Sequence, residues 1–237
     1  MSESYYEPGE GRAARVNELF GHVARRYDLL NDLQSLGLHR RWKRRVIELA
    51  APRPGLQALD VCCGTGDLAL GLARRGAETV GLDFSEAMLE VAIARGERAK
   101  IQLRFIQGDA LALPFGDGSF DIVTVGYGLR NLASWEGGVR EMQRVARRAG
   151  KIVSLDFGKP EWGLWRVVYF GYLRLCVPWL GRFFCGSAGA YSYILESLRH
   201  YAGQEAVAER MRELGLRNVR VIRLLGGAMA IHYAEKA

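Results

Sequence analysis

The sequence predicts an α/β fold built around a doubly wound, mostly parallel sheet. Short apolar runs alternate along the chain with amphipathic segments of helical period, the pattern of successive βα units. The first apolar run leads directly into the turn Gly64-Thr65-Gly66, which indicates a strand–loop–helix unit. The last two apolar runs are separated only by Gly226-Gly227, which predicts a terminal hairpin and one antiparallel strand.

Seven apolar or alternating runs predict the strands, and the segments between them predict the helices. The expected strands are 57–62, 78–83, 103–107, 120–125, 151–158, 218–225 and 228–235. The expected helices are 67–75, 86–96, 134–150 and 203–215. Ser85 and Ser134 stand where side chains cap helix starts, and glycines follow the expected helix ends.

Length and composition favour one domain. The chain has 237 residues, 49% of them hydrophobic, which is enough for a single core. No stretch of about 18 residues without charges indicates a membrane-spanning helix, and the polar start does not resemble a secretory signal. A reduced cytoplasmic environment is therefore expected. The formal net charge of +7 indicates an anionic partner, such as nucleic acid, anionic lipid or a phosphorylated substrate.

Two segments do not follow the βα pattern. Residues 1–50 are expected to form an N-terminal helical extension, which carries the basic run RRWKRR. Residues 157–203 are expected to form a helical insert that is rich in aromatic side chains and arginine. Two interpretations of the insert stay open. It forms either a lid or helices that meet a membrane surface, or else it packs as ordinary helices on the sheet edge.

Two adjacent cysteines precede the glycine-rich turn in the stretch ALDVCCGTGDLAL. Neighbouring residues on a strand point to opposite faces, so Cys62 and Cys63 favour small apolar packing over a metal or redox site. Gly64 and Gly66 leave room for a ligand to approach the main chain and the start of the following helix. Asp67 stands where a P-loop requires lysine, which argues against a nucleotide triphosphate.

The second expected strand ends in a carboxylate, Asp83, 17 positions after Gly66. A carboxylate at this place accepts hydrogen bonds from both ribose hydroxyls of an adenosine. The alternative is an acid at the N-terminus of the helix that begins near Ser85. The strand–loop–helix context on both sides favours the ribose role.

With these residues assembled, the chain resembles class I S-adenosylmethionine-dependent methyltransferases. The ordered motifs LDVCCGTGD, VGLDFSEAML, GDALALPF and FDIVTVGYGLRN carry that resemblance. More closely, it resembles the ubiquinone/menaquinone biosynthesis C-methyltransferase family. That resemblance covers residues 20–236 and includes YDLLNDLQSLGLHRRWK, REMQRV, LDFGKP, AYSYILESL and GGAMAIH. It implies a seven-stranded Rossmann-like sheet.

The resemblance also implies the reactants. S-adenosylmethionine donates the methyl group, and a ring carbon of a prenylated quinol receives it. The two-cysteine turn is more similar to the menaquinone members, so demethylmenaquinol is the expected substrate and the ubiquinone precursor is the alternative. A prenyl tail requires transient contact with a membrane surface, so the protein is expected to be cytoplasmic and peripherally associated with the inner face of the membrane.

The resemblance places seven residues at the cofactor. Gly64, Thr65 and Gly66 are expected at its amino-acid end and Asp83 at its ribose. Asp109 and Ala110 are expected at the adenine, where an acceptor can take the exocyclic amine. Asp60 either orients the turn or contacts the ligand through water.

Four residues are expected at the quinol. Tyr27, Arg130 and Asn131 are assigned to the ring, with Arg130 favouring a phenolate or activating a water. The alternative for Arg130 is a structural salt bridge. His39 is the rival general base, because its ordinary pKa suits proton transfer near neutrality, although helix packing explains it as well. His232 is expected to be a packed histidine.

Two other functions compete. A nucleic-acid methyltransferase would suit the basic charge, but GYGLRN lacks the proline of base-methylating motifs, so no nucleic acid is expected. A non-catalytic S-adenosylmethionine-binding module would assemble other enzymes. A homodimer remains open, and no metal is expected.

Overall fold

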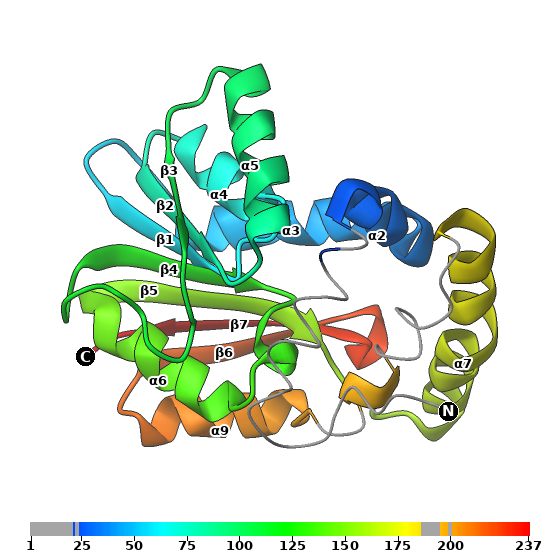
Figure 1. Ribbon diagram of the computed structural model, residues 1–237. Coiled ribbons are helices and arrows are strands. Elements are labelled where there is room, and N and C mark those ends of the chain that lie inside the picture. The colour runs from blue at the N-terminus through cyan, green and yellow to red at the C-terminus, as the bar shows by residue number, and fades with distance from the viewer. Residues whose placement is uncertain (1–20, 22–23, 186–194, 199–200) are drawn as a thin grey trace.

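The computed structural model describes residues 21, 24–185, 195–198 and 201–237. Seven strands form one sheet in the order β3-β2-β1-β4-β5-β7-β6 (Figure 1). The strands are β1 Gln57–Val61, β2 Glu78–Asp83, β3 Arg104–Gln107, β4 Phe120–Gly126, β5 Ala146–Phe157, β6 Arg217–Leu224 and β7 Met229–Glu235. Strands β1 to β5 pair in parallel, whereas β7 runs antiparallel to both of its neighbours. The expected doubly wound sheet and terminal hairpin are therefore confirmed.

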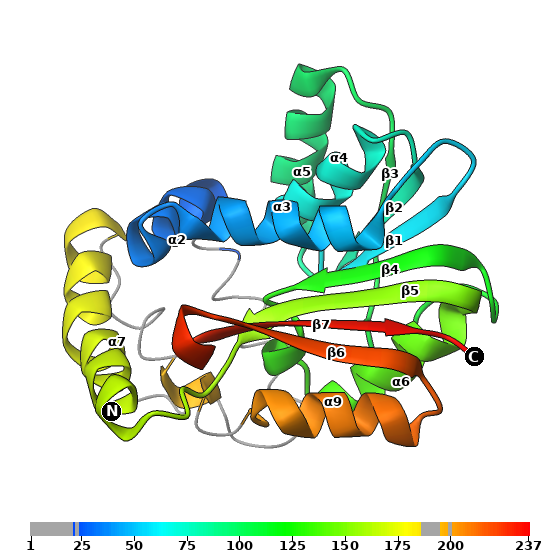
Figure 2. The ribbon, with the colours of Figure 1, turned by 180° about the vertical axis from the view of Figure 1, so that it is seen from behind.

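Helices cover both faces of this sheet (Figure 2). They are α2 Tyr27–Ser35, α3 Leu38–Ala50, α4 Asp67–Ala73, α5 Glu86–Ala99, α6 Trp135–Val145, α7 Gly163–Cys185 and α9 Gln204–Glu213. The described part of the chain also contains three short 3-10 helices, namely η1 Ala24–Arg26, η2 Leu129–Asn131 and η3 Leu225–Gly227. Helices α3 and α4 pack on one face of the sheet, and α6 and α9 pack on the other. Helices α2 and α3 lie within the range of the expected N-terminal extension, and α7 lies within the range of the expected insert.

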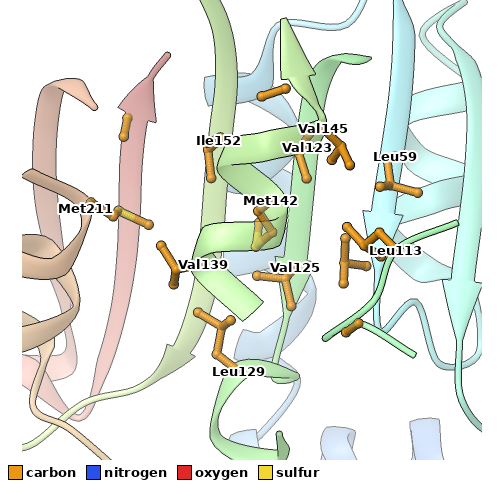
Figure 3. Packing of buried hydrophobic residues seen from close by; sticks show 14 of the residues in the cluster. Leu59, Leu113, Val123, Val125, Leu129, Val139, Met142, Val145, Ile152 and Met211 are labelled. Carbon is orange, nitrogen blue, oxygen red and sulfur yellow. The ribbon is translucent and has the colours of Figure 1, made fainter. Parts of the chain in front are cut away.

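The larger core cluster lies between the sheet and helices α6 and α9. Figure 3 shows Val123 and Ile152 of the strands facing Val139 and Met142 of α6, with Met211 of α9 beside them. All five side chains are fully buried. Burying such a side chain stabilises a fold by roughly 1.5–3 kcal/mol, so this layer fixes the central strands beneath the site.

One expected boundary is wrong. The run of residues 146–150 was expected to continue the helix that Ser134 begins, but α6 ends at Val145 and β5 already begins at Ala146. The pairing jumps from Phe120–Ala146 to Ile122–Lys151, so the residues between them form a bulge, with Ala149 at a φ of 59°. The arginines of this run continued the helical period in the sequence, which concealed the bulge.

The two serine caps differ. The Ser134 hydroxyl accepts a hydrogen bond from the Gly137 amide, as expected of an N-cap. Ser85 occupies the N-cap position of α5, but its side chain makes no capping bond. The Asp83 carboxylate accepts from the Ser85 amide instead, at 2.9 Å.

Helices α2 and α7 stand together beyond the carboxyl ends of the strands (Figure 1). Three side chains hold α7 in place. The Tyr172 hydroxyl donates to the Gln34 carbonyl of α2, and the Trp165 ring nitrogen and Tyr169 hydroxyl donate to the Leu225 and Ala228 carbonyls. Among the described residues, no helix is long and apolar enough to cross a membrane. The expected motif at 190–198 lies largely outside the described residues, as do residues 1–20.

Candidate active site

The glycine-rich turn connects the carboxyl end of β1 to the start of α4. Gly64 has a φ of 54°, and the space where its Cβ would stand is open. Gly66 has a φ of 84°, and a Cβ there would lie 3.1 Å from the Ala92 Cβ. The two glycines therefore serve different ends. Gly66 lets the turn pack on α5, whereas Gly64 leaves its main chain accessible to a ligand.

Asp83 and Asp109 lie beside this turn, at the carboxyl ends of neighbouring strands. The Asp83 carboxylate accepts from the Gly64 amide at 2.7 Å as well as from the amide of Ser85. The Asp109 carboxylate accepts from the Leu111 amide at 2.8 Å, and Ala110 beside it is buried. Burial raises the pKa of Asp83, although its backbone hydrogen bonds oppose that shift. The structure thus brings together Gly64, Asp83, Asp109 and Ala110.

Asp60 is buried at the end of β1. Its carboxylate accepts from the Ala69 amide of α4 at 3.0 Å and from the Thr124 hydroxyl at 2.8 Å. Burial raises its pKa to about 7 despite both bonds. Of the two expected roles of Asp60, these contacts support orientation of the turn, since they tie the start of α4 to β1 and β4.

Cys62 and Cys63 pack in different places. A Cβ at Gly128 would lie 2.5 Å from the Cys62 Cβ, and one at Gly81 would lie 3.0 Å from the Cys63 sulfur. Burial raises the pKa of both thiols well above the ordinary value, so both are neutral. Within the described part of the chain, no cluster of three or more His, Cys, Asp or Glu side chains could hold a metal.

A network of charged side chains ties the turn to α2, α3 and α5. The Thr65 hydroxyl donates to Asp28 at 2.8 Å, and Arg95 donates to Thr65 and to both Asp28 and Asp67. Lys43 donates to Asp67 at 2.6 Å. Burial works against the charged form of Asp67, but the Lys43 and Arg95 charges outweigh it and lower its pKa to about 2. Sequence reasoning did not single out any of these partners of Thr65.

The basic run RRWKRR is not exposed along its whole length. Trp42 and Lys43 in its middle are both buried. Only the four arginines of the run, Arg40, Arg41, Arg44 and Arg45, are exposed. The Lys43 ammonium lies 5.8 Å from the centre of the Tyr127 ring, so it links the cofactor turn to the end of β4.

Arg130 forms a buried ion pair with Asp156 at the end of β5, at 3.0 Å. This is the salt bridge that stood as the alternative to quinol binding. Arg130 also donates to the Tyr127 carbonyl at 2.6 Å, and Asn131 donates to the same carbonyl at 3.0 Å. Tyr127 has a φ of 62°, a conformation that non-glycine residues rarely adopt. The two side chains therefore stabilise a strained backbone at the end of β4.

An apolar cavity of about 300 Å³ lies next to this strained residue, between α2, α3, α7 and the β6–β7 turn. It lies at the carboxyl ends of the strands, where open α/β sheets bind their ligands. Its lining is mainly aromatic and aliphatic: Asn31, Gln34, Ser35, Leu36, Leu38, His39, Trp42, Tyr127, Phe157, Trp165, Val168, Tyr169, Tyr172, Leu173, Leu225, Ala228 and Met229. The lining thus combines residues of α2, α3 and α7 with residues at the ends of β4 and β5 and in the β6–β7 turn.

Three polar atoms of this lining have no hydrogen-bond partner among the described residues. They are the Asn31 amide nitrogen, His39 Nδ1 and the Tyr127 hydroxyl, and all three atoms are buried. The other nitrogen of His39, Nε2, lies 2.9 Å from the Asp32 carboxylate. Burial lowers the pKa of His39, although Asp32 opposes the shift, and burial raises the pKa of Tyr127 well above its usual value.

The quinol residues expected from the sequence are thus only partly gathered at the cavity. His39 lines the cavity. Arg130 and Asn131 are not among the lining residues and instead donate hydrogen bonds to the Tyr127 carbonyl. Tyr27 is half-buried and packs against the cluster that includes Tyr169. Sequence reasoning missed Tyr127, and its place between two glycines after an apolar strand was the available signal.

Solved structures with the same fold include methyltransferases and also the [4+2]-cyclase SpnF. A possible histamine N-methyltransferase from Thermotoga maritima has a TM-score of 0.66 at 17% identity and covers 94% of this chain and 100% of its own. Phosphoethanolamine N-methyltransferase 2 from Haemonchus contortus, solved with S-adenosyl-L-methionine, has a TM-score of 0.64 at 15% identity. The match covers 83% of this chain and 52% of that protein. At these identities the likeness shows the fold, which is that of class I S-adenosylmethionine-dependent methyltransferases.

Sequence comparison defines the family. The model of the ubiE/COQ5 methyltransferase family matches residues 9–236. A demethylmenaquinone methyltransferase from Thermus thermophilus is 42% identical over 92% of this chain and 100% of its own. Another demethylmenaquinone methyltransferase, from Desulfitobacterium hafniense, is 41% identical over 96% of this chain and 92% of its own. The chain belongs to the ubiE/COQ5 methyltransferase family and is an S-adenosylmethionine-dependent methyltransferase.

The residues at the turn fit this cofactor. An open main chain at Gly64 suits an extended ligand, and the carboxylates of Asp83 and Asp109 can accept from ribose hydroxyls and an exocyclic amine. S-adenosylmethionine supplies an electrophilic methyl group on a sulfonium.

Proposed function

We propose that the protein methylates a ring carbon of a prenylated quinol, demethylmenaquinol, in menaquinone biosynthesis. The observation that carries this proposal is the aromatic cavity of about 300 Å³ beside Tyr127, at the carboxyl end of β4. Its size and lining suit a flat apolar ring with few polar groups. The names of the relatives at 42% and 41% identity support the same substrate.

The chemistry requires the reduced ring. A hydroquinone that loses one hydroxyl proton pushes electron density onto the neighbouring ring carbon, which then attacks the methyl group, whereas an oxidised quinone has no such density. The protein must hold the ring in line with the methyl group and exclude water. Trp42, Tyr127 and Phe157 supply apolar walls for this purpose, and Trp42 and Tyr127 are themselves buried.

We also propose that the cavity receives its substrate from a membrane surface. Large apolar side chains are exposed on or next to the helices that line the cavity, with Leu36 exposed by 87%, and Leu164 of α7 and the preceding Trp162 by 81% each. Val167, Val168 and Leu175 of α7 and Leu225 of the β6–β7 turn are exposed as well. Isolated exposed apolar residues are common, but several around one apolar cavity suit a lipid contact.

Charged residues support the same orientation. Arg166 and Arg174 of α7 are exposed, as are the arginines of α3. Arginine next to tryptophan and leucine is typical of peripheral helices at anionic lipid surfaces. We expect the protein to bind vesicles that contain anionic lipid and to release them at high salt.

The test of the substrate is an assay with labelled S-adenosylmethionine and chemically reduced demethylmenaquinone in detergent. Parallel reactions contain the unreduced quinone, the reduced ubiquinone precursor and bulk RNA. We expect label only in the reduced menaquinone precursor. Label in the ubiquinone precursor instead would retain the chemistry and replace the substrate, and cofactor binding without transfer to any quinol would refute the proposal.

The test of the membrane contact is flotation with vesicles of anionic and of zwitterionic lipid. Replacing Trp162 and Leu164 by serine should reduce binding to the anionic vesicles. Activity on a substrate with a short, water-soluble side chain should stay unchanged in this variant. Equal flotation of variant and wild type would exclude this face as the contact.

A further inference from the structure

The cavity contains the described chain's only group of unpartnered buried polar atoms that share one apolar site. The Asn31 amide nitrogen, His39 Nδ1 and the Tyr127 hydroxyl come from α2, α3 and the end of β4. A buried polar atom without a partner destabilises a protein, so native structures contain few of them. Three around one cavity indicate a ligand that brings their partners.

The Asp32 contact fixes the hydrogen on the His39 ring. A carboxylate only accepts, so the Nε2 that lies 2.9 Å from it carries the hydrogen and donates. Burial keeps the imidazole neutral, because it lowers the pKa of His39. Nδ1 of a neutral ring that donates through Nε2 has a free lone pair. His39, a lining residue of the cavity, therefore carries an acceptor nitrogen without a partner in the described chain, and Asp32 pairs with its other nitrogen.

We propose that Asp32 and His39 form a proton-accepting pair for one ring hydroxyl of the methyl acceptor, while Tyr127 and Asn31 donate hydrogen bonds to the ring oxygens. This proposal rests on the quinol function and specifies how the chain binds and activates that ring. His39 is the catalytic residue, and Asp32 is a positioning residue that orients the imidazole and stabilises its charged form, as carboxylates do in histidine-based catalysis.

The proton and electrons balance. The O–H bond of the ring breaks, its proton moves to His39 Nδ1, and the electron pair stays on oxygen. The neighbouring ring carbon then forms the new C–C bond, and the pair of the broken C–S bond stays on sulfur. The ring carbon loses its hydrogen as a proton to solvent, and the ring oxygen takes back the proton of Nδ1. The net products are methylated quinol, neutral thioether and one proton.

The environment of His39 suits this cycle. Asp32 faces it from α2, and Arg40, Lys43 and Asp67 contribute charges from α3 and α4. The Asp32 carboxylate also accepts from Arg40 at the protein surface, so it stays ionised. Arg130 does not compete for the proton, because a guanidinium stays protonated.

The first test compares His39→Gln and Asp32→Asn with wild type in the reduced-quinol assay. General bases contribute about 100-fold to 10,000-fold, so kcat should fall at least about 100-fold in His39→Gln. Asp32→Asn should lower kcat about tenfold and move the acid limb of the pH profile to lower pH, because Asp32 raises the pKa of His39. A purely structural role would not move that limb. Glu48→Gln, an exposed carboxylate on α3, is the matched control with unchanged kcat.

The second test uses Tyr127→Phe, with Tyr233→Phe on β7 as its control. Removing one hydrogen bond should raise KM for the quinol about fivefold in Tyr127→Phe only. Binding of S-adenosylmethionine, measured by calorimetry, should stay within twofold of wild type in every variant, which also verifies folding. If His39→Gln fails that check, His39→Gly with added imidazole replaces it, and the proposal requires that imidazole restore activity.

The outcomes distinguish a failure of the Asp32–His39 pair from a failure of the proposed quinol methylation. Wild-type protein that methylates no quinol refutes the proposed function itself. Wild-type activity combined with a kcat within threefold in His39→Gln, and with an unchanged pH profile in Asp32→Asn, overturns the proton-accepting pair and leaves the quinol function intact.

Discussion

His39 and His232 are both buried, yet their surroundings differ in one respect. His232 lies on β7, where Nδ1 is 3.0 Å from the Ser154 hydroxyl and Nε2 is 2.8 Å from the Gln204 carbonyl. His39 lies on α3 with one nitrogen paired to Asp32 and the other unpartnered at an apolar cavity. Burial lowers the pKa of both, to about 4 in His232. Burial alone therefore does not distinguish a core histidine from a functional one.

The hydrogen-bond partners do distinguish them. Buried polar groups whose partners lie within the chain, such as His232 and the Arg130–Asp156 pair, hold elements together. Buried atoms at the cavity, such as His39 Nδ1 and the Tyr127 hydroxyl, lack partners in the described chain. Substitution in the first group should reduce stability, and substitution in the second should reduce activity with little loss of stability.

The largest expected effect on stability comes from Arg130→Met. This change leaves the Asp156 carboxylate buried without its cation, and breaking a buried pair in this way costs about 3–5 kcal/mol. Chemical denaturation should show that decrease in the free energy of unfolding. Adding Asp156→Asn to the variant removes the unpaired charge and should restore part of the loss. A decrease in the free energy of unfolding below about 1 kcal/mol would instead assign Arg130 to the residues that serve activity.

The second effect is the pH dependence that His232 gives to stability. Its pKa is about 4 in the folded protein and 6.5 in the unfolded chain, so the unfolded chain binds more protons between these values. The contribution of His232 to the free energy of unfolding is therefore fully present above pH 6.5 and is lost as the pH falls toward 4. The loss amounts to roughly 3 kcal/mol for 2.5 pH units.

Denaturation of wild type and His232→Gln at several pH values measures this contribution. Glutamine does not titrate, so the variant should show a smaller decrease between pH 6.5 and 4. If the free energy of unfolding falls equally with pH in the two proteins, His232 does not control the loss of stability in acid. The stability data would then not distinguish His232 from His39.

The third effect concerns a carboxylate that belongs to both groups. Asp83 accepts from the Gly64 and Ser85 amides, and its oxygens retain acceptor capacity for a ligand. Asp83→Asn should weaken the binding of S-adenosylmethionine by about 10-fold to 100-fold, since hydrogen bonds to charged groups contribute about 1.5–3 kcal/mol. Calorimetry measures this, with Glu78→Gln at the exposed start of β2 as the control. Equal affinity in both variants would assign Asp83 to the turn alone.

Much of the arrangement around the glycine-rich turn was predictable because its signals are local. Gly64, Gly66 and Asp83 lie within one βαβ unit, and apolar runs identify its strands. The sequence also predicted the hairpin of β6 and β7 from adjacent glycines. Residues 146–150 were assigned wrongly, because tertiary pairing with β4 overrides a helical period that continues through the arginines.

The acceptor side was much less predictable. Asn31, His39 and Tyr127 become neighbours of one cavity only through the packing of α2, α3 and β4, and no sequence spacing records that arrangement. The sequence indicated Arg130 by its place after the fourth expected strand and His39 by its residue type. Only the hydrogen-bond partners separate them, since Arg130 contacts Asp156 and the Tyr127 backbone whereas His39 retains an unpartnered nitrogen.

The smallest effect is also the most diagnostic, because its sign is opposite to that of the others. Tyr127 has a buried hydroxyl without a partner in the described chain, so Tyr127→Phe removes an atom that costs stability. The free energy of unfolding should rise by about 1 kcal/mol, the lower end of the cost of a buried unsatisfied group. The ring contacts with Phe157 and the Lys43 ammonium stay in place, so little packing is lost.

Denaturation of the ligand-free protein measures this change. Tyr169 is the control, because its hydroxyl donates to the Ala228 carbonyl, so Tyr169→Phe should lose stability instead. A gain in stability together with weaker quinol binding in Tyr127→Phe is the pattern expected of a residue retained for function. A loss of stability equal to that of Tyr169→Phe would mean that the Tyr127 hydroxyl is structural.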